Sequence, residues 1–320
     1  MKFIAIVVGL FLSTVAQAWE PTKPIKVIIP SSPGSIHDTG FRSFQEDFES
    51  ATGAKLVFEY RSGSAGIIAT NHFMTLEPDD HTLIATTSIS HVMGEVTNPE
   101  LVTYDFLNDF EYITGVIASS IVIAVSTESE INTREEFFNW LKTTDTPITF
   151  STTFPNQIVA TNLILDALGV DEDKAIFVKY SKSVPAATDV ASGKVDVWVG
   201  GVPPTVPLYQ AEKLKYIAVL SKEELDILPG IPTIHEVIPN VIQVSTVGVL
   251  THKGTSPEVL AWYRKHINNA LLGEGAVNLR TNRFVILNQD ALTEQGLRDA
   301  YSGNRKLLEP GYREIFPPKK

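Results

Sequence analysis

The chain has 320 residues, no cysteine, and 37 acidic against 26 basic residues, which gives a formal net charge of −11 at pH 7. The lack of cysteine excludes a disulfide scaffold, a thiol nucleophile and a thioether-linked lipid anchor. An acidic chain without a Lys/Arg cluster is not expected to bind nucleic acid, because phosphate neutralisation needs a basic patch. Chains beyond about 250–300 residues usually divide into two or more domains, so two are expected here.

The first 18 residues have the pattern of a secretory signal peptide. Lys2 precedes an apolar run at residues 3–12, and the small residues Ala16 and Ala18 suit a signal peptidase. The run is shorter than the roughly 20 apolar residues that a membrane-spanning helix needs. We therefore expect a soluble, exported protein that is not lipid-anchored, with a retained N-terminal anchor as the alternative.

Short runs of β-branched residues alternate with longer amphipathic segments from residue 25 onward. Strands are expected at 25–29, 55–59, 82–86, 121–125, 147–150, 176–179, 195–199, 215–220 and 246–250. Helices with N-terminal and C-terminal signals are expected after Gly34, Thr133, Ser183 and Ser256. This alternation is typical of an α/β fold with mainly parallel sheets.

Two of these strands are candidates for connections between domains. The apolar stretch 116–125, which contains strand 121–125, is interrupted by Ser119 and Ser120 and is not expected to span a membrane. If strands 121–125 and 246–250 each pass between domains, the chain forms two lobes. Lobe 1 would comprise residues 19–120 and 246–320, and lobe 2 residues 121–245.

The first strand ends in the sequence PSSPGSIHD, at residues 30–38, and a helix follows. A helix start leaves backbone N–H groups free, with the positive end of the helix dipole behind them, and this arrangement binds anions. Pro33 fixes the approach of the chain, and Gly34 and Ser35 are small enough to let an anion reach the backbone. Asp38 either caps these N–H groups or holds an ordered water molecule. An ordinary strand-to-helix turn is the alternative.

A second small-residue turn, RSGSAG at residues 61–66, follows the next strand, and Thr86, Thr87 and Ser88 end the third. In an open α/β sheet, ligands bind outside the carboxyl ends of the strands. Three such strand ends in one lobe predict a site for a small anion. A nucleotide is not expected, since neither a P-loop nor a G-x-G-x-x-G motif is present.

The order and spacing of these motifs resemble the solute receptors of tripartite tricarboxylate transporters, also called Bug proteins. The first turn is similar to the family's P-x-P-G-G-x-x-D pattern and the second to its R-P-G-A-G-G pattern. Further similar stretches are PDDHTLIATT at 78–87, TYDFLNDFEYITGV at 103–116, VPAATDVASGKVDVWVGG at 184–201, LPGIPTIHEV at 228–237 and GVLTHKGTSPEV at 248–259. The resemblance covers nearly the whole chain after residue 20.

The resemblance implies a two-lobed periplasmic-binding-protein fold, a Venus flytrap that closes on a small organic carboxylate for delivery to integral-membrane permease subunits. We expect a monomer without enzymatic activity, cofactor or metal. The second lobe would contribute side chains from the turn after strand 147–150 and from the end of strand 195–199. The expected ligand-binding residues are Pro33, Gly34, Ser35, Ile36, His37, Asp38, Ser64, Ala65, Gly66, Thr86, Thr87, Ser88, Ser151, Thr152, Thr153, Asn156 and Gly200.

Three departures from the family pattern leave the identity of the acid open. Ser35 replaces the second glycine of the first turn, and STTFPN at 151–156 replaces a glycine-rich turn. Gly200 and Gly201 follow the strand where the family often has a polar or acidic group. Trp198 beside them either reaches the cleft wall or packs in the core.

The histidines do not show metal-ligand spacing, and His72, His81 and His91 are expected at the surface or at caps. His37 lies inside the anion turn, and if it points into the cleft its charge would respond to pH near neutrality. Two other functions stay open. An exported enzyme acting on a carboxylate would need His37 or Asp38 as its base, and a ligand-sensing receptor would signal to a sensor kinase.

Overall fold

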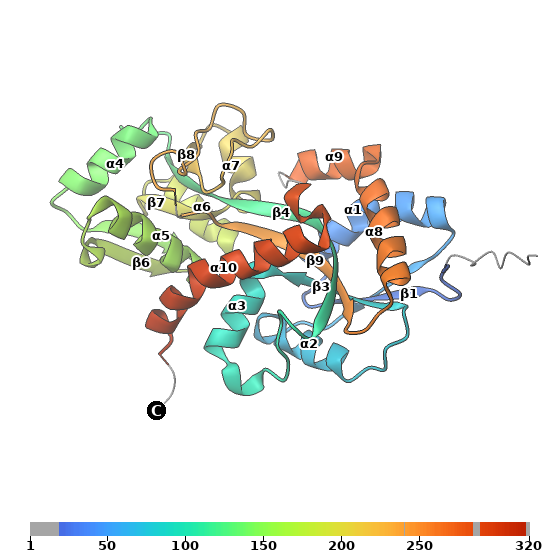
Figure 1. Ribbon diagram of the computed structural model, residues 1–320. Helices are drawn as coiled ribbons and strands as arrows, with labels where there is room; N and C mark the ends of the chain where they lie inside the picture. Colours follow the sequence, from blue (N-terminus) through green and yellow to red (C-terminus); the bar gives the residue numbers. More distant parts are fainter. Residues whose placement is uncertain (1–18, 240, 284–288, 318–320) are drawn as a thin grey trace, which may run out of the picture.

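The computed structural model of the chain describes residues 19–239, 241–283 and 289–317, and the expected signal peptide at residues 1–18 lies outside them. One curled sheet runs through the molecule, with helices packed on both faces (Figure 1). The strands of the described residues are β1 (Ile25–Ile29), β2 (Leu56–Tyr60), β3 (Thr82–Thr87), β4 (Phe110–Ser126), β5 (Ile148–Thr152), β6 (Ala175–Lys179), β7 (Val197–Gly201), β8 (Leu214–Val219) and β9 (Val244–His252).

The helices of the described residues surround this sheet. They are α1 (Ile36–Thr52), α2 (Ile67–Met74), α3 (Ser88–Thr97), α4 (Arg134–Thr143), α5 (Pro155–Leu168), α6 (Ser183–Ala191), α7 (Val206–Gln210), α8 (Pro257–Leu271), α9 (Glu274–Arg283) and α10 (Glu294–Ile315). No described helix is long and apolar enough to cross a lipid bilayer. A capping box of Thr133 and Glu136 is present at the start of α4, the helix expected after Thr133.

Every predicted strand is observed with its ends shifted by two residues or fewer, except the fourth, which begins at Phe110 instead of residue 121. The sheet is also mixed, not mainly parallel. Parallel pairing joins β1 to β2 and β3, and β5 to β6 and β7, whereas β4 and β9 are antiparallel to their neighbours on either side. The reason is that β9 returns the chain from the second group of strands to the first. It therefore runs through the first sheet in the opposite direction and pairs with its neighbours in antiparallel fashion.

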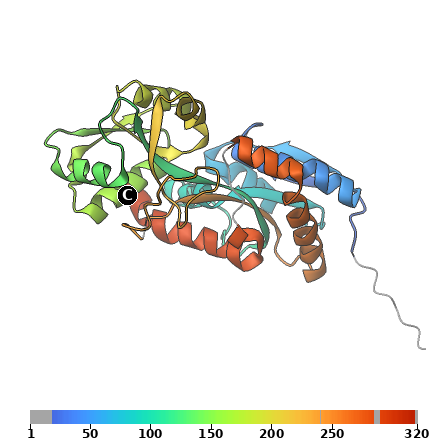
Figure 2. The same ribbon diagram turned by 90° about the horizontal axis from the view of Figure 1, so that it is seen from above.

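Strand β4 belongs to two groups of strands. Its residues 110–120 pair with β9, and its residues 121–126 pair with β7 and β8. We propose this change of partner, between Ser120 and Ile121, as the boundary between the lobes. With this boundary, strand β9 would lie within the first group, because it pairs with β4 only as far as Ser120. The chain would then return between the lobes just before β9, where Gln243 N–H donates to Leu220 O. Figure 2 shows the two groups side by side.

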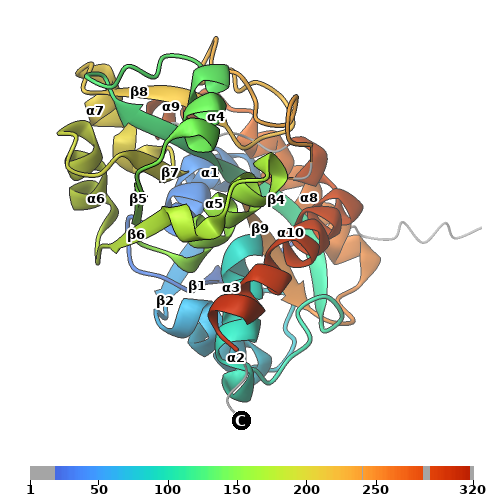
Figure 3. The same ribbon diagram turned by 90° about the vertical axis from the view of Figure 1, so that its left-hand side faces the viewer.

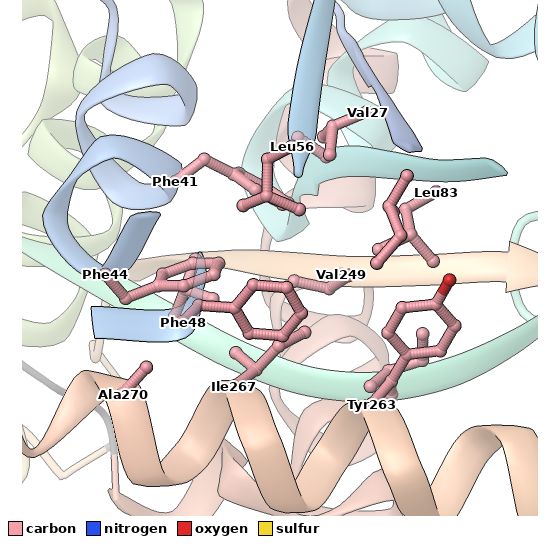
Figure 4. Packing of buried hydrophobic residues seen from close by; sticks show 14 of the residues in the cluster. Val27, Phe41, Phe44, Phe48, Leu56, Leu83, Val249, Tyr263, Ile267 and Ala270 are labelled. Atoms are coloured by element: carbon pink, nitrogen blue, oxygen red, sulfur yellow. The ribbon is translucent and has the colours of Figure 1, made fainter. Parts of the chain in front are cut away.

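The core of the first group is formed by helices α1 and α8 packed on one face of the sheet (Figure 4). The stripe of Phe41, Phe44 and Phe48, at helical spacing in the sequence, is fully buried there. Alternate residues of β1 point to opposite faces, as the period-two pattern predicts, with Val27 in this cluster and Ile28 in the cluster on the other face. Burying each of these phenylalanines contributes about 2–3 kcal/mol.

Helix α10 connects the two groups a third time. It packs along α3 and onto the sheet, and its C-terminal turns reach α5, where Leu308 and Tyr312 form a small cluster with Val159 (Figures 1 and 3). Its close approach to the sheet depends on a glycine of β9. A Cβ atom on Gly248 would lie 2.8 Å from the hydroxyl oxygen of Tyr301.

We predict that Gly248→Ala lowers the free energy of unfolding by about 1–3 kcal/mol, because overpacking would push α10 away from β9. The matched control is Gly303→Ala in α10 itself, where an added Cβ meets no atom within 4 Å. That substitution should raise stability by about 0.5–1 kcal/mol, since glycine is unfavourable within a helix. Urea denaturation measures both; equal effects of the two variants would contradict the packing argument.

Candidate functional site

A cavity of about 530 Å³ is lined by both groups of strands. Its lining comes from the β1–α1 turn, the β2–α2 turn, the start of α3, the crossing point of β4, the start of α5 and the end of β7. The residues are Pro30, Ser31, Ser32, Ile36, His37, Ser62, Gly63, Ser64, Ala65, Gly66, Thr87, Ile89, Ser90, His91, Met93, Ser119, Ser120, Ile121, Phe154, Asn156, Gln157, Ser183, Trp198, Gly201, Pro204 and Ser245. None of these described residues is Asp, Glu, Lys or Arg, so a ligand here meets neutral groups.

The first turn leaves free only some of the amides that were expected to bind an anion. Gly34 N–H donates to Asp38 Oδ2 at 2.7 Å, and Ser35 N–H donates to Ser32 O at 3.2 Å. These two amides are therefore already occupied within the protein. The amides of Ile36 and His37 have no acceptor among the described residues, and both residues line the cavity. The free amides of this helix start are thus those of Ile36 and His37, two residues beyond Gly34 and Ser35.

Pro33, Gly34, Ser35 and Asp38 are not part of the cavity lining. Gly34 has a φ of +81°, in the left-handed region that favours glycine, and a Cβ added to it would meet no atom within 4 Å. The backbone conformation at this position favours glycine, and the structure shows no need for a small residue to leave room for an anion. Ser35 is the N-cap of α1, with its Oγ accepting from Asp38 N–H.

Asp38 caps the turn, which is one of its two expected roles. Its Oδ1 accepts from Arg42 Nε at 2.9 Å and from the Tyr60 hydroxyl at 2.6 Å. Burial alone would raise the pKa of this carboxyl, but hydrogen bonds from Tyr60 and Gly34 and the charge of Arg42 outweigh burial and hold the pKa below its usual value of 3.8. A carboxylate this firmly engaged is a structural group.

We predict that Asp38→Asn lowers the free energy of unfolding by about 2–3 kcal/mol at pH 7, because Arg42 and Tyr60 lose a charged acceptor. The depressed pKa means that the stabilisation is complete above pH 4 and is lost as the pH falls through the folded-state pKa. The difference in unfolding free energy between the wild type and the variant should therefore shrink as the pH is lowered below 3.8. The exposed Asp145→Asn is the control, and a difference that does not change with pH would contradict this assignment.

Two histidines face the cavity, and both are neutral at physiological pH. Burial lowers the pKa of His37 to about 4 and that of His91 well below its usual value of 6.5. His37 Nδ1 is 2.9 Å from Ser31 Oγ, whereas His37 Nε2 and His91 Nδ1 have no hydrogen-bond partner among the described residues. The expectation that His91 is a surface or capping residue is wrong, because its ring is 3% exposed and stacks on Phe106.

The second turn holds its backbone in a strained conformation. Ser64 and Ala65 have φ values of 46° and 54°, in the left-handed region that costs about 1–2 kcal/mol for a residue with a Cβ. Successive amides in such turns form concave anion sites. The N–H groups of Ser64 and Ala65 have no acceptor among the described residues, and Ser64, Ala65 and Gly66 line the cavity as predicted. Backbone strain of this kind gathers at binding sites.

We predict that Ala65→Gly leaves the free energy of unfolding unchanged or raises it by up to about 1 kcal/mol, since relief of strain offsets the added freedom of the unfolded chain. Ala51→Gly, at an exposed position in the last turn of α1, should instead cost about 0.5–1 kcal/mol. Chemical denaturation compares them. Similar losses in both variants would show that Ala65 is not strained.

Of the hydroxyl residues at the end of β3, only Thr87 lines the cavity. Its Oγ1 also accepts from Ser90 N–H, which caps α3. Thr86 Oγ1 is hydrogen-bonded to the hydroxyl of Tyr301, and Ser88 Oγ accepts from Asn304 Nδ2 at 2.9 Å. Thr86 and Ser88 therefore attach α10 to the sheet instead of facing a ligand.

Asn156 is the only predicted residue of the second group that lines the cavity. Ser151, Thr152, Thr153 and Gly200 lie behind the lining. The N–H groups of Thr153 and Phe154 both donate to Gln157 Oε1, at 2.5 and 2.9 Å, so this turn is closed by its own side chain. For Trp198, the sequence allowed either the core or the cleft wall. Its side chain is fully buried and also lines the cavity.

Much of the lining was not predicted, above all a set of serines and the side chains of Gln157 and Trp198. Ser119 and Ser120 stand at the crossing point of β4. A pair of hydroxyl residues inside a buried apolar strand was a signal that could have identified them. Ser183 and Ser245 carry no comparable local signal. Within the described residues, no group of three His, Asp or Glu side chains is placed to hold a metal ion.

Comparison with known proteins gives one consistent match. The model of the tripartite tricarboxylate transporter family receptor matches residues 41–285. Protein BugT of Bordetella pertussis is 22% identical over 285 residues, which are 87% of each chain. A TctC solute-binding protein from Polaromonas has a TM-score of 0.76 at 19% identity, over 92% of this chain and 99% of that one. MatC from Rhodopseudomonas palustris, solved with bound malate, has a TM-score of 0.69 at 19% identity, over 91% and 99%.

These solved structures confirm the two-lobed periplasmic-binding-protein fold expected from the sequence. The similarity covers both groups of strands, since it extends over more than nine-tenths of the chain. The family that the sequence resembles and the fold of the structure are therefore consistent with each other.

Proposed function

Because the chain belongs to the tripartite tricarboxylate transporter receptor family, we propose that it captures a small organic acid in the periplasm and delivers it to the membrane permease subunits of a transporter. It acts as a monomer after removal of residues 1–18. Closure of the two lobes over the cavity would hold the acid and present a new surface to the permease. Binding without chemical conversion is the proposed activity.

The observation that carries this proposal is a neutral cavity with free backbone donors on one side. The amides of Ile36 and His37 stand at the start of α1, and those of Ser64 and Ala65 at the strained turn. A carboxylate is well matched to such donors, because helix-start amides and the helix dipole stabilise negative charge without a cation. MatC, with its bound malate, provides a small organic acid bound by a protein of the same fold.

The direct test is thermal denaturation of the purified protein with mono-, di- and tricarboxylates, aromatic acids and amino acids. A ligand that binds only the native state raises the melting temperature, by an amount equivalent to about 2.7 kcal/mol at one hundred times Kd. We expect at least one carboxylate to do so with one molecule bound per chain, and to be recovered unchanged. Chemical conversion of the acid would instead support an exported enzyme.

We predict that Asn156→Trp weakens binding of the identified acid more than tenfold, because an indole at the start of α5 would occupy the cavity. Asn139→Trp, at an exposed position on α4, is the matched control and should bind normally. Isothermal titration measures both affinities, and the melting temperatures of the free variants report folding. Full affinity in a folded Asn156→Trp variant would place the acid elsewhere.

A further inference from the structure

The wall of the cavity contributed by the second group has two side chains packed against Gly200. A Cβ atom on Gly200 would collide with Gln157 Nε2 and would lie 2.6 and 2.7 Å from Cζ2 and Cε2 of Trp198. The bare glycine therefore allows the amide of Gln157 and the indole edge of Trp198 to approach the same point of β7. Both side chains line the cavity.

Both side chains offer hydrogen-bond donors. Trp198 Nε1–H can only donate, and it is buried with no acceptor among the described residues. The carbonyl oxygen Oε1 of Gln157 is held by the N–H groups of Thr153 and Phe154, which leaves Nε2 as its donor toward Gly200. The Nε2 atom donates to no acceptor within the described chain. A buried donor without an acceptor is costly, so a ligand acceptor beside Trp198 Nε1–H would be favoured.

The same lining has no group to receive a positive charge. The described residues that line the cavity include no carboxylate. Asp38, beside the first turn, is outside the lining and is engaged by Gly34, Arg42 and Tyr60. A ligand ammonium would lose its water without gaining a counter-charge, which costs several kcal/mol.

We propose that the bound acid carries no ammonium group, and that its end distant from the α1 amides presents a hydrogen-bond acceptor to Trp198 Nε1–H and Gln157 Nε2–H. The acceptor is a carbonyl, hydroxyl or second carboxyl oxygen. This inference rests on the proposed function, since it takes the cavity to hold an organic acid. It defines a ligand class that excludes free amino acids and simple fatty acids.

Matched acids test the proposal on the full mature protein. Succinate and L-aspartate, and likewise glutarate and L-glutamate, differ by one amino group, while butyrate lacks the distal acceptor of succinate. We expect succinate or glutarate to bind at least tenfold more tightly than its amino acid and than butyrate in titration calorimetry. Equal or tighter binding of the amino acid or of butyrate would overturn this inference and leave the proposed function intact. If no carboxylate of the wider panel binds, both fail.

Two variants locate the acceptor at the wall. Trp198→Phe keeps the ring but removes the donor, and should weaken the preferred diacid about tenfold, the equivalent of one hydrogen bond. Butyrate binding should not change, and Trp140→Phe on α4 is the control. Gln157→Glu keeps the oxygen that caps Thr153 and Phe154 but replaces the donor with a negative charge. Gln157→Glu should weaken binding of the diacid at least tenfold. The affinity ratio between the diacid and the amino acid should fall, or the amino acid should become the tighter ligand.

The outcomes separate recognition from structure. A Trp198→Phe variant that loses the diacid and butyrate equally would show a general packing role and would overturn the assignment. So would a Gln157→Glu variant that keeps the wild-type preference against the amino acid. Melting temperatures of the free variants within a few degrees of the wild type establish that each has folded, and either variant alone is sufficient to decide.

Discussion

The continuity of strand β4 is the constraint on which the rest of the structure depends. One strand of 17 residues pairs with β9 along its first part and with β7 and β8 along its second. Because a single strand joins both groups, their sheets meet where Ser119, Ser120 and Ile121 enter the cavity lining. The proposed ligand site therefore lies beside this connection, and a rotation about the strand would change the width of the cavity directly.

Local patterns in the sequence were sufficient to predict most of the fold. The structure contains the features that three local signals indicate. These signals are the β-branched runs, the phenylalanine stripe of α1 and the capping box at Thr133. Strand β4 was predicted at less than half its length, because Thr114, Gly115 and the serine pair interrupt its apolar pattern. Pairing with β9 over nine positions holds that part extended, and such long-range pairing leaves no local trace.

The site was predicted in part, and the difference has a physical reason. Of the residues expected from the small-residue turns after β1 and β2, Ile36, His37 and residues 64–66 line the cavity. Which amides stay free depended on Asp38 turning back to Gly34, which spacing alone does not determine. The opposite wall combines Trp198, Gln157 and a glycine between them, and only the packing of α5 against β7 brings these together.

The lack of charged side chains in the described lining also governs how the protein responds to its medium. Dissolved salt weakens attraction between exposed charges over about 10 Å at 0.1 M. An acid held by neutral donors and peptide dipoles inside a cavity is insulated from this effect. The net charge of −11 on the whole chain, in contrast, repels an approaching anion most strongly in dilute solution. Salinity should therefore alter how quickly the acid arrives far more than how long it stays.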